Sequence, residues 1–370
     1  MPTNAYVPKR EAAVPANIHA HELALSKVFS STYLFSIPDY QRPYAWTTDE
    51  VDDLLDDLTS ALDDAGPSTQ ITDVSPYFLG SVVLIKADDT PNSDVVDGQQ
   101  RLTTLTILFC ILRELAPPDV AGDIHQVVCQ KGNPLLGLAD VYRLTARERD
   151  ADFFRTLIQE RGGITLLDKY KGELTDSQWN MKANAQAIHR RLSEMSSDAR
   201  FRFASFLLLR CFVVVVAASD QQAAFRIFSV MNDRGLNLTP TDILKAKLLG
   251  NLPETARKKY TAVWEDMEEW LGRGDFEALF GHIRMIEVKA KAQKSVIEEM
   301  EKYVLHKHKP AVFIDRLLVP YGDAFEIVKA ASYKSTTGAD RINTLLTSLN
   351  RVDNQDWVPV AIWALAKRPF

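Results

Sequence analysis

The stretch from Ser81 to Leu115, SVVLIKADDTPNSDVVDGQQRLTTLTILFCILREL, decides the expected fold. Its apolar, β-branched start predicts a strand, the polar run ADDTPNSD predicts a turn, and VV predicts a returning strand. The apolar run after DGQQR predicts a buried helix, which the prolines at 117 and 118 end. The expected order is therefore a hairpin, a tight turn and a buried helix.

The tight turn from Asp97 to Arg101 has the composition of an anion-binding site. Gly98 allows the backbone to approach a ligand closely, and the free N–H groups of a helix that starts near Gln100 face the same turn. Arg101 offers a bidentate fork to phosphate, while Asp97 could hold a divalent metal or orient a water. The residues alone leave a second interpretation open, a well-capped Asp-Gly turn without a ligand.

A second motif, IPDYQRPYAW, occupies Ile37 to Trp46 and combines prolines with aromatic rings. It is either a packed aromatic corner of the core or a surface that binds a flat or anionic partner. A capping box, Thr47 followed by Glu50, predicts the start of the next helix. That helix has an apolar face and an acidic face, and the acidic face would repel phosphate.

The composition is that of an ordinary globular protein. The chain has 370 residues, a formal net charge of −6, and 46% hydrophobic and 25% charged residues, which argues against a uniformly basic nucleic-acid coat. Three cysteines stand far apart without a CxxC pair, so we expect reduced thiols and no zinc site. The run FLLLRCFVVVVAA is too short to span a bilayer and indicates a strand or a helix–strand junction. We expect a cytoplasmic protein that does not contact membranes.

Two further segments complete the expected organisation. The run NDRG, from Asn232 to Gly235, interrupts two apolar helices; it is either a helix–helix corner or places Asn232 and Arg234 beside the phosphate-binding turn. The N-terminal run ANIHAHELALSKVFSS is expected to be a helix. Helical periodicity continues from Pro253 onward.

Four blocks in this order, IPDYQRPYAW, FLGSVV, VVDGQQRLTTL and FSVMNDRGLNLTPTDILKAKLL, carry a resemblance to a known family. From about Ile18 to Leu249 the chain resembles the N-terminal domain of the GmrSD-type restriction endonucleases, a broad family that includes effectors of phosphorothioate-DNA defence. The DGQQR block resembles the phosphate-binding turn of the ParB and sulfiredoxin-like fold. The implied fold class is α+β, a small sheet with the DGQQR turn followed by a mostly helical region.

The resemblance implies an NTP-hydrolysing, DNA-sensing domain that uses Mg²⁺ and, as the expected nucleotide, GTP. The implied domains are a nucleotide-binding and DNA-sensing αβ part at 1–130, a helical part of the same family domain at 131–250, and a helical bundle at 251–370. Family members usually carry a C-terminal HNH-type nuclease domain; its histidine motif does not occur here, so we expect that partner domain in a longer polypeptide. A homodimer is left open. The alternative is a reader of modified DNA, phosphorothioate or glucosylated, that does not hydrolyse nucleotide.

The resemblance also assigns roles to individual residues. The expected catalytic residues are Asp97, Gln100 and Arg101, with Asp97 as the metal ligand. The remaining assignments cover nucleotide binding by Gly98, Gln99, Gln100, Arg101, Asn232 and Arg234, and DNA sensing by Tyr40, Gln41, Arg42, Pro43, Tyr44 and Trp46. Arg42 could reach either the nucleotide or the DNA.

Overall fold

The computed structural model describes residues 18–66, 69–220, 223–224, 227–228 and 240–367. The chain forms two compact units. The first comprises the described residues of 1–38 and 43–235, and the second comprises 39–42 and the described residues of 236–370. The expected division at 130 and 250 stays a prediction.

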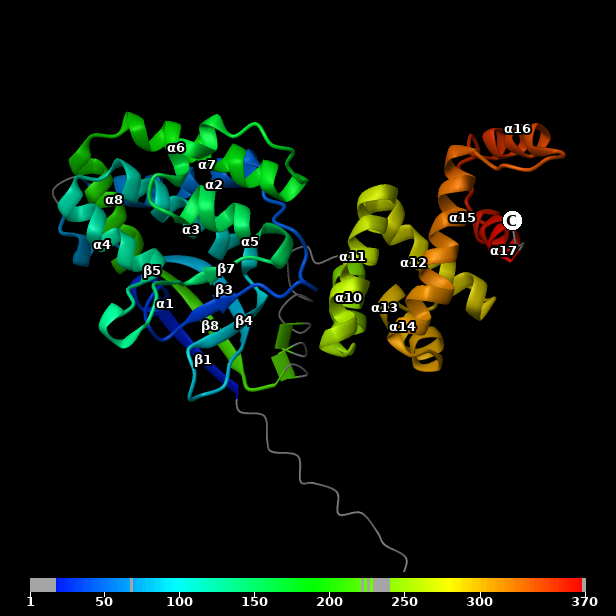
Figure 1. Ribbon diagram of the computed structural model, residues 1–370, viewed down its shortest axis with the longest axis horizontal. Helices are drawn as coiled ribbons and strands as arrows, with labels where there is room; N and C mark the ends of the chain where they lie inside the picture. The colour runs from blue at the N-terminus through cyan, green and yellow to red at the C-terminus, as the bar shows by residue number, and fades with distance from the viewer. Residues whose placement is uncertain (1–17, 67–68, 221–222, 225–226, 229–239, 368–370) are drawn as a thin grey trace, which may run out of the picture. The chain divides into compact units, whose positions relative to one another are not determined.

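The first unit is built on a six-stranded mixed sheet with the order β1-β8-β3-β4-β2-β7. Figure 1 shows helices α2 to α8 gathered on one side of this sheet. The strands are β1 (Ile18–Ala24), β2 (Leu34–Ser36), β3 (Tyr77–Ile85), β4 (Asn92–Asp97), β7 (Leu144–Thr145) and β8 (Cys211–Ala218).

The hairpin expected from the sequence is confirmed, because β3 and β4 pair antiparallel. The strand β8 begins directly after a helix that ends at Arg210, which confirms the expected helix–strand junction. β8 runs parallel to β3 and places Val213 and Val215 in the core. Its β-branched residues suit a strand with neighbours on both sides.

The expected N-terminal helix is wrong over most of its length. Residues Ile18–Ala24 form the strand β1, which pairs antiparallel with β8 from one end to the other. Only the next four residues, Leu25–Val28, are helical (α1). A ladder to a strand up to 200 residues away in the sequence, with Ile18 opposite Ala218, overrides the local preference.

The helix α3 (Gln99–Leu115) is buried along nearly its whole length, as expected for the run after DGQQR. The capping box is also confirmed: the Thr47 hydroxyl accepts from the Asp49 N–H, and Glu50 accepts from the Thr47 N–H at 2.7 Å. The other helices of this unit are α2 (Thr48–Asp63), α4 (Pro118–Val128), α5 (Glu148–Phe154), α6 (Gly163–Lys169), α7 (Asp176–Glu194) and α8 (Ser197–Arg210). A small two-stranded sheet joins β5 (Cys129–Gln130) to β6 (Val141–Tyr142).

The described part of the second unit is helical from residue 240 onward, as expected. In its core, the ring of Phe276 packs edge to face against both Trp264 and Phe280. Its longer helices are α10 (Pro240–Gly250), α11 (Glu254–Leu271), α12 (Arg273–Val288), α15 (Val319–Ala330), α16 (Ala339–Leu349) and α17 (Val358–Ala366). The class is therefore mixed α/β and 62% helical. Across the described residues, no helix is long and apolar enough to cross a membrane.

Candidate functional site

Two neighbouring strands bring both sequence motifs to the same end of the sheet. β2 and β4 are parallel, with Ser36 opposite Asp94. The chain leaves β2 into the Ile37–Trp46 stretch and leaves β4 into the Asp97–Arg101 turn. The carboxyl ends of neighbouring parallel strands open on one side of a sheet, where α/β proteins commonly bind ligands.

Gly98 forms the turn between β4 and α3. Its φ of 88° is left-handed, and a Cβ there would lie 2.9 Å from Cγ2 of Val82. Both the backbone conformation and the lack of space therefore call for glycine. Gly98 stands at the N-cap and contributes no capping side chain, so the first turn of α3 presents its N–H groups at a positive helix end. This arrangement suits an anion.

Arg101 lies half-buried in the first turn of α3, against the backbone of β3. Its Nη1 donates to the Ser81 carbonyl at 2.9 Å, and Gly80 leaves room for the guanidinium because a Cβ there would lie 3.0 Å from Nη2. Burial lowers the pKa of Arg101, while the nearby charge of Asp97 acts in the opposite direction. Within the described residues one hydrogen bond uses one of five donors, so the fork can offer others to a ligand.

Gln100 is buried and ties the turn to the second motif. Its Oε1 accepts from the N–H groups of Ala45 at 2.8 Å and Trp46 at 3.2 Å, and its Nε2 donates to the Pro43 carbonyl at 3.0 Å. The side-chain amide is thus engaged in holding the backbone of residues 43–46. This placement makes Gln100 a positioning residue in the structure, and a direct catalytic role stays a prediction. Its neighbour Gln99 is also buried.

Tyr44 is a buried core residue, so this part of the aromatic motif is a packed corner and not a binding surface. Its hydroxyl lies 2.8 Å from Oγ1 of Thr104 on α3 and accepts from Nδ2 of Asn184 on α7 at 2.8 Å. Burial raises the pKa of Tyr44 to about 12, and the hydrogen bonds to Thr104 and Asn184 oppose that rise. Asn184 also donates to the Trp46 carbonyl at 2.8 Å. Tyr44 therefore anchors the Ile37–Trp46 motif to α3 and α7.

A buried charged pair continues this network. The Tyr44 N–H donates to Oγ of Ser177 at 3.2 Å, and that hydroxyl donates to Oδ2 of Asp150 at 3.1 Å. The same Oδ2 lies 3.0 Å from Nη2 of Arg147. Both members of the ion pair are almost fully buried, which makes the pair costly to break.

The remaining residues of the motif divide between the two units. Tyr40, Gln41 and Arg42 group with the second unit, and Pro43 and Trp46 with the first. Tyr40 and Gln41 are buried, whereas Arg42, Pro43 and Trp46 are half-buried. The half-buried residues are the ones whose exposure suits contact with DNA.

Two other expected site residues, Asn232 and Arg234, lie outside the described residues. On α10, Asp242 and Lys245 share one face and find partners within the second unit. Lys245 Nζ lies 3.1 Å from Oε1 of Glu265, and Asp242 Oδ2 lies 3.2 Å from Nη2 of Arg273. These contacts link α10 to α11 and to the start of α12.

The residues that support Tyr44 belong to none of the sequence motifs. Thr104, Asn184 and Ser177 contact Tyr44 from positions 60 to 140 residues away. A lone polar residue on an otherwise apolar helix face is the only local signal for them, and it does not name a partner.

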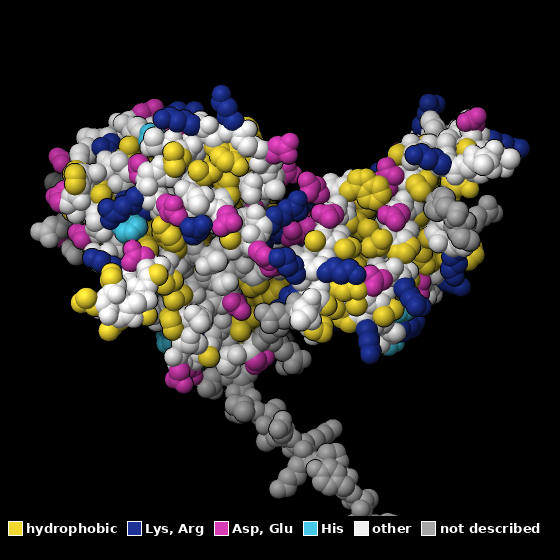
Figure 2. All heavy atoms as spheres, viewed as in Figure 1, with side chains coloured by type: hydrophobic (Ala, Val, Ile, Leu, Met, Phe, Trp, Pro, Cys, Tyr) yellow, Lys and Arg dark blue, Asp and Glu magenta, His cyan; other side chains and the backbone are white. Residues whose placement is uncertain are grey.

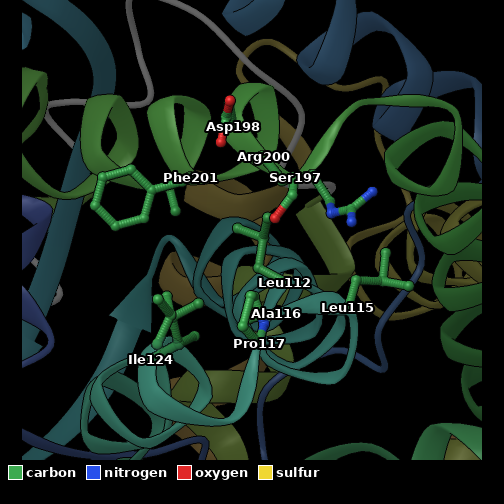
Figure 3. A pocket seen from close by; sticks show the side chains of 11 residues that line it. Leu112, Leu115, Ala116, Pro117, Ile124, Ser197, Asp198, Arg200 and Phe201 are labelled. Carbon is green, nitrogen blue, oxygen red and sulfur yellow. The ribbon is translucent and has the colours of Figure 1, made fainter.

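A pocket of about 190 Å³ lies elsewhere in the first unit, between α3, α4 and α8 (Figure 3). Leu112 and Leu115 line it from the C-terminal part of α3. The rise of 1.5 Å per residue separates Leu112 from Gln100 by roughly 18 Å. The pocket is mostly apolar and contains none of the expected site residues.

Comparison with known protein families places the chain. The family model of the GmrSD restriction endonuclease N-terminal domain matches residues 25–249, which is more than half of the chain. No curated protein matches the chain. The matched range contains both motifs and the whole six-stranded sheet except for β1.

Proposed function

We propose that this chain, which belongs to the GmrSD restriction endonuclease family through its N-terminal domain, is the part of a restriction enzyme that senses DNA modification and hydrolyses a nucleotide. Membership in the family implies a role in restriction-modification defence and DNA as the substrate of the whole enzyme. The nucleotide, GTP, and the modification, phosphorothioate, are finer proposals. A ParB- and sulfiredoxin-like origin of the sheet is a further proposal.

The nucleotide half of the proposal is supported by the turn after β4. Three features suit a triphosphate: the first turn of α3 has no capping side chain, Gly98 has no room for a Cβ, and the guanidinium of Arg101 is half-buried nearby. Asp97, half-buried beside Arg101, would hold Mg²⁺, which would supply charge neutralisation at the phosphates. Arg101 would bind and orient the phosphates, and the N–H groups of α3 would stabilise their charge.

The DNA half of the proposal is supported by the half-buried part of the Ile37–Trp46 stretch. A phosphorothioate carries sulfur in place of a backbone oxygen, and sulfur is larger and more weakly hydrated. An apolar surface such as the ring of Pro43 would accept sulfur at a lower desolvation cost than oxygen. Arg42 would contact a neighbouring phosphate. Figure 2 shows acidic and basic side chains interspersed on the visible face of the first unit, which favours local over general recognition.

The clamp made by Gln100 is the observation that carries the proposal. Its three hydrogen bonds connect the first turn of α3 to residues 43–46. If bound DNA moved the backbone of residues 43–46, the side chain of Gln100 would therefore move with it and shift the phosphate-binding turn. The coupling would then license a nuclease domain, which is proposed as a partner in the full-length protein.

One observation favours the alternative, a reader that does not hydrolyse nucleotide. The side-chain amide of Gln100 uses its oxygen and one of its two N–H donors in the clamp, so a water-orienting role falls mainly to Asp97. Steady-state phosphate release from Mg²⁺-GTP separates the two functions. We expect turnover in the native protein and a loss of about 10²–10³ in Arg101→Ala, with Arg155→Ala, a half-exposed arginine of the same unit, as the control. Nucleotide binding without turnover would establish the reader instead.

A further inference from the structure

The structure brings together three metal-binding side chains far from the motifs discussed above. His125 lies on α4, Cys129 begins β5, and Asp140 closes the loop before β6. One ligand atom from each lies within 4.8 Å of the other two. This group departs from the expectation, drawn from the cysteine spacing, that the chain has no zinc site; only His125 and Cys129 are close in sequence, and the closing loop brings in Asp140.

The donor set matches the chemistry of zinc. Thiolate, imidazole and carboxylate are its usual protein ligands, and bond lengths of about 2.0–2.3 Å at tetrahedral angles set the ligand atoms about 3.3–3.8 Å apart. A shift of about 1 Å would therefore close the set around an ion. Cys129 is buried, His125 is half-buried and Asp140 is exposed, so one side is open to entry and to a water as fourth ligand.

The thiol and the carboxylate are both free to bind. Across the described residues, Sγ of Cys129 makes one weak contact, 3.8 Å to the Gln130 carbonyl. Asp140 uses Oδ1 to accept from the Gly132 N–H at 2.8 Å, and its second oxygen can serve as a ligand. Gly132 makes this closure possible, because a Cβ there would collide with the backbone of Leu138 and Ala139.

His125 can bind only if it releases Arg113. Nη1 of Arg113 lies 3.1 Å from Nδ1 of His125, so in the neutral ring Nδ1 accepts and Nε2 carries the proton. Zinc at either nitrogen breaks this contact. Arg113 keeps two other partners, the carbonyls of Gln159 at 2.7 Å and Glu160 at 3.1 Å. The cost is thus one hydrogen bond, and the two anionic ligands, Cys129 and Asp140, would balance the charge of the zinc ion.

We propose that His125, Cys129 and Asp140 form a zinc site that fastens the 131–140 loop to the end of α4. This loop exposes Leu135, Leu136 and Leu138 to solvent. A metal at its base would fix how it presents these side chains. The site is separate from the nucleotide turn, so its existence does not depend on the proposed function.

Cobalt(II) titration of the chelator-treated full chain tests the site directly. We expect one equivalent to produce a thiolate-to-cobalt charge-transfer band, and one equivalent of zinc to abolish it. Cys129→Ser should remove the band. Asp140→Asn, an exposed substitution compatible with folding, should weaken binding on the order of tenfold or more, since even loss of an outer-shell partner has this effect.

Asp123→Asn provides the matched control, because Asp123 is an exposed acid on the same helix. It should bind cobalt like the native chain. Circular dichroism would verify that each variant is folded. The absence of a charge-transfer band in the folded native chain overturns the proposal. So does a band that persists in Cys129→Ser, or binding that is equal in Asp140→Asn and the native protein.

Discussion

Among single residues, Gln100 connects the phosphate-binding turn to the backbone of residues 43–46. Removing its amide leaves the N–H of Ala45 and the carbonyl of Pro43 without their partner. We expect Gln100→Ala to lower the free energy of unfolding by about 1–3 kcal/mol and to weaken the stimulation of hydrolysis by DNA more than basal hydrolysis. Urea unfolding and phosphate release measure the two effects. Unchanged stability together with unchanged stimulation would refute the clamp.

Asp97 is expected to act on turnover and not on nucleotide affinity. A carboxylate that holds a metal or a water acts mainly as charge develops in the transition state. Asp97→Asn keeps the shape of the side chain, so phosphate release should fall well below the native rate while calorimetric GTP affinity changes little. If affinity falls as much as the rate, Asp97 is a binding or folding residue.

At the scale of elements, α7 holds the aromatic motif in place through Asn184. This residue is fully buried and donates to both the Tyr44 hydroxyl and the Trp46 carbonyl at 2.8 Å. We expect Asn184→Ala to cost about 1–3 kcal/mol of stability and to reduce DNA discrimination with GTP affinity retained. Gln186→Ala, an exposed change on the same helix, should leave both unchanged. Equal effects of the two substitutions would rule out a specific role for Asn184.

In the second unit, His282 on α12, which packs against Phe325 of α15, should make stability depend on pH. Burial lowers the pKa of His282 from 6.5 to about 4, and the neighbouring Asp275 opposes this shift. Its Nε2 is buried and finds no hydrogen-bond partner among the described residues. The unfolded chain takes up the proton first, so stability is present above pH 6.5 and declines as the pH falls toward 4.

Urea unfolding at pH 7 and pH 5 measures this dependence. His282→Leu keeps an apolar contact with Phe325, whose ring centroid lies 5.1 Å from that of His282, and should lose less stability on acidification than the native protein. Identical losses in both proteins would show that other groups cause the acid sensitivity.

Across the whole molecule, the sequence predicts those features that depend on residues close together in the chain. The β3–β4 hairpin, the capping box at Thr47 and the helix after Gly98 all follow from neighbouring residues, and all are found. The strand β1 could not be predicted, because its partner β8 lies at the other end of the sheet-forming region. The burial of Tyr44 depends in the same way on α3 and α7, and the His125 cluster depends on how a loop closes.

In the proposed function, modified DNA and nucleotide act on one connected site. The most direct test is the rate of GTP hydrolysis by the native protein with a phosphorothioate duplex and with a plain duplex of the same sequence, at one fixed salt concentration. We expect the modified duplex to raise the rate of hydrolysis above the rate with the plain duplex. Pro43→Ala should lower the ratio of these two rates roughly five- to thirty-fold, the equivalent of about 1–2 kcal/mol of apolar contact. Hydrolysis that is absent, or equal with both duplexes, would contradict the proposed function.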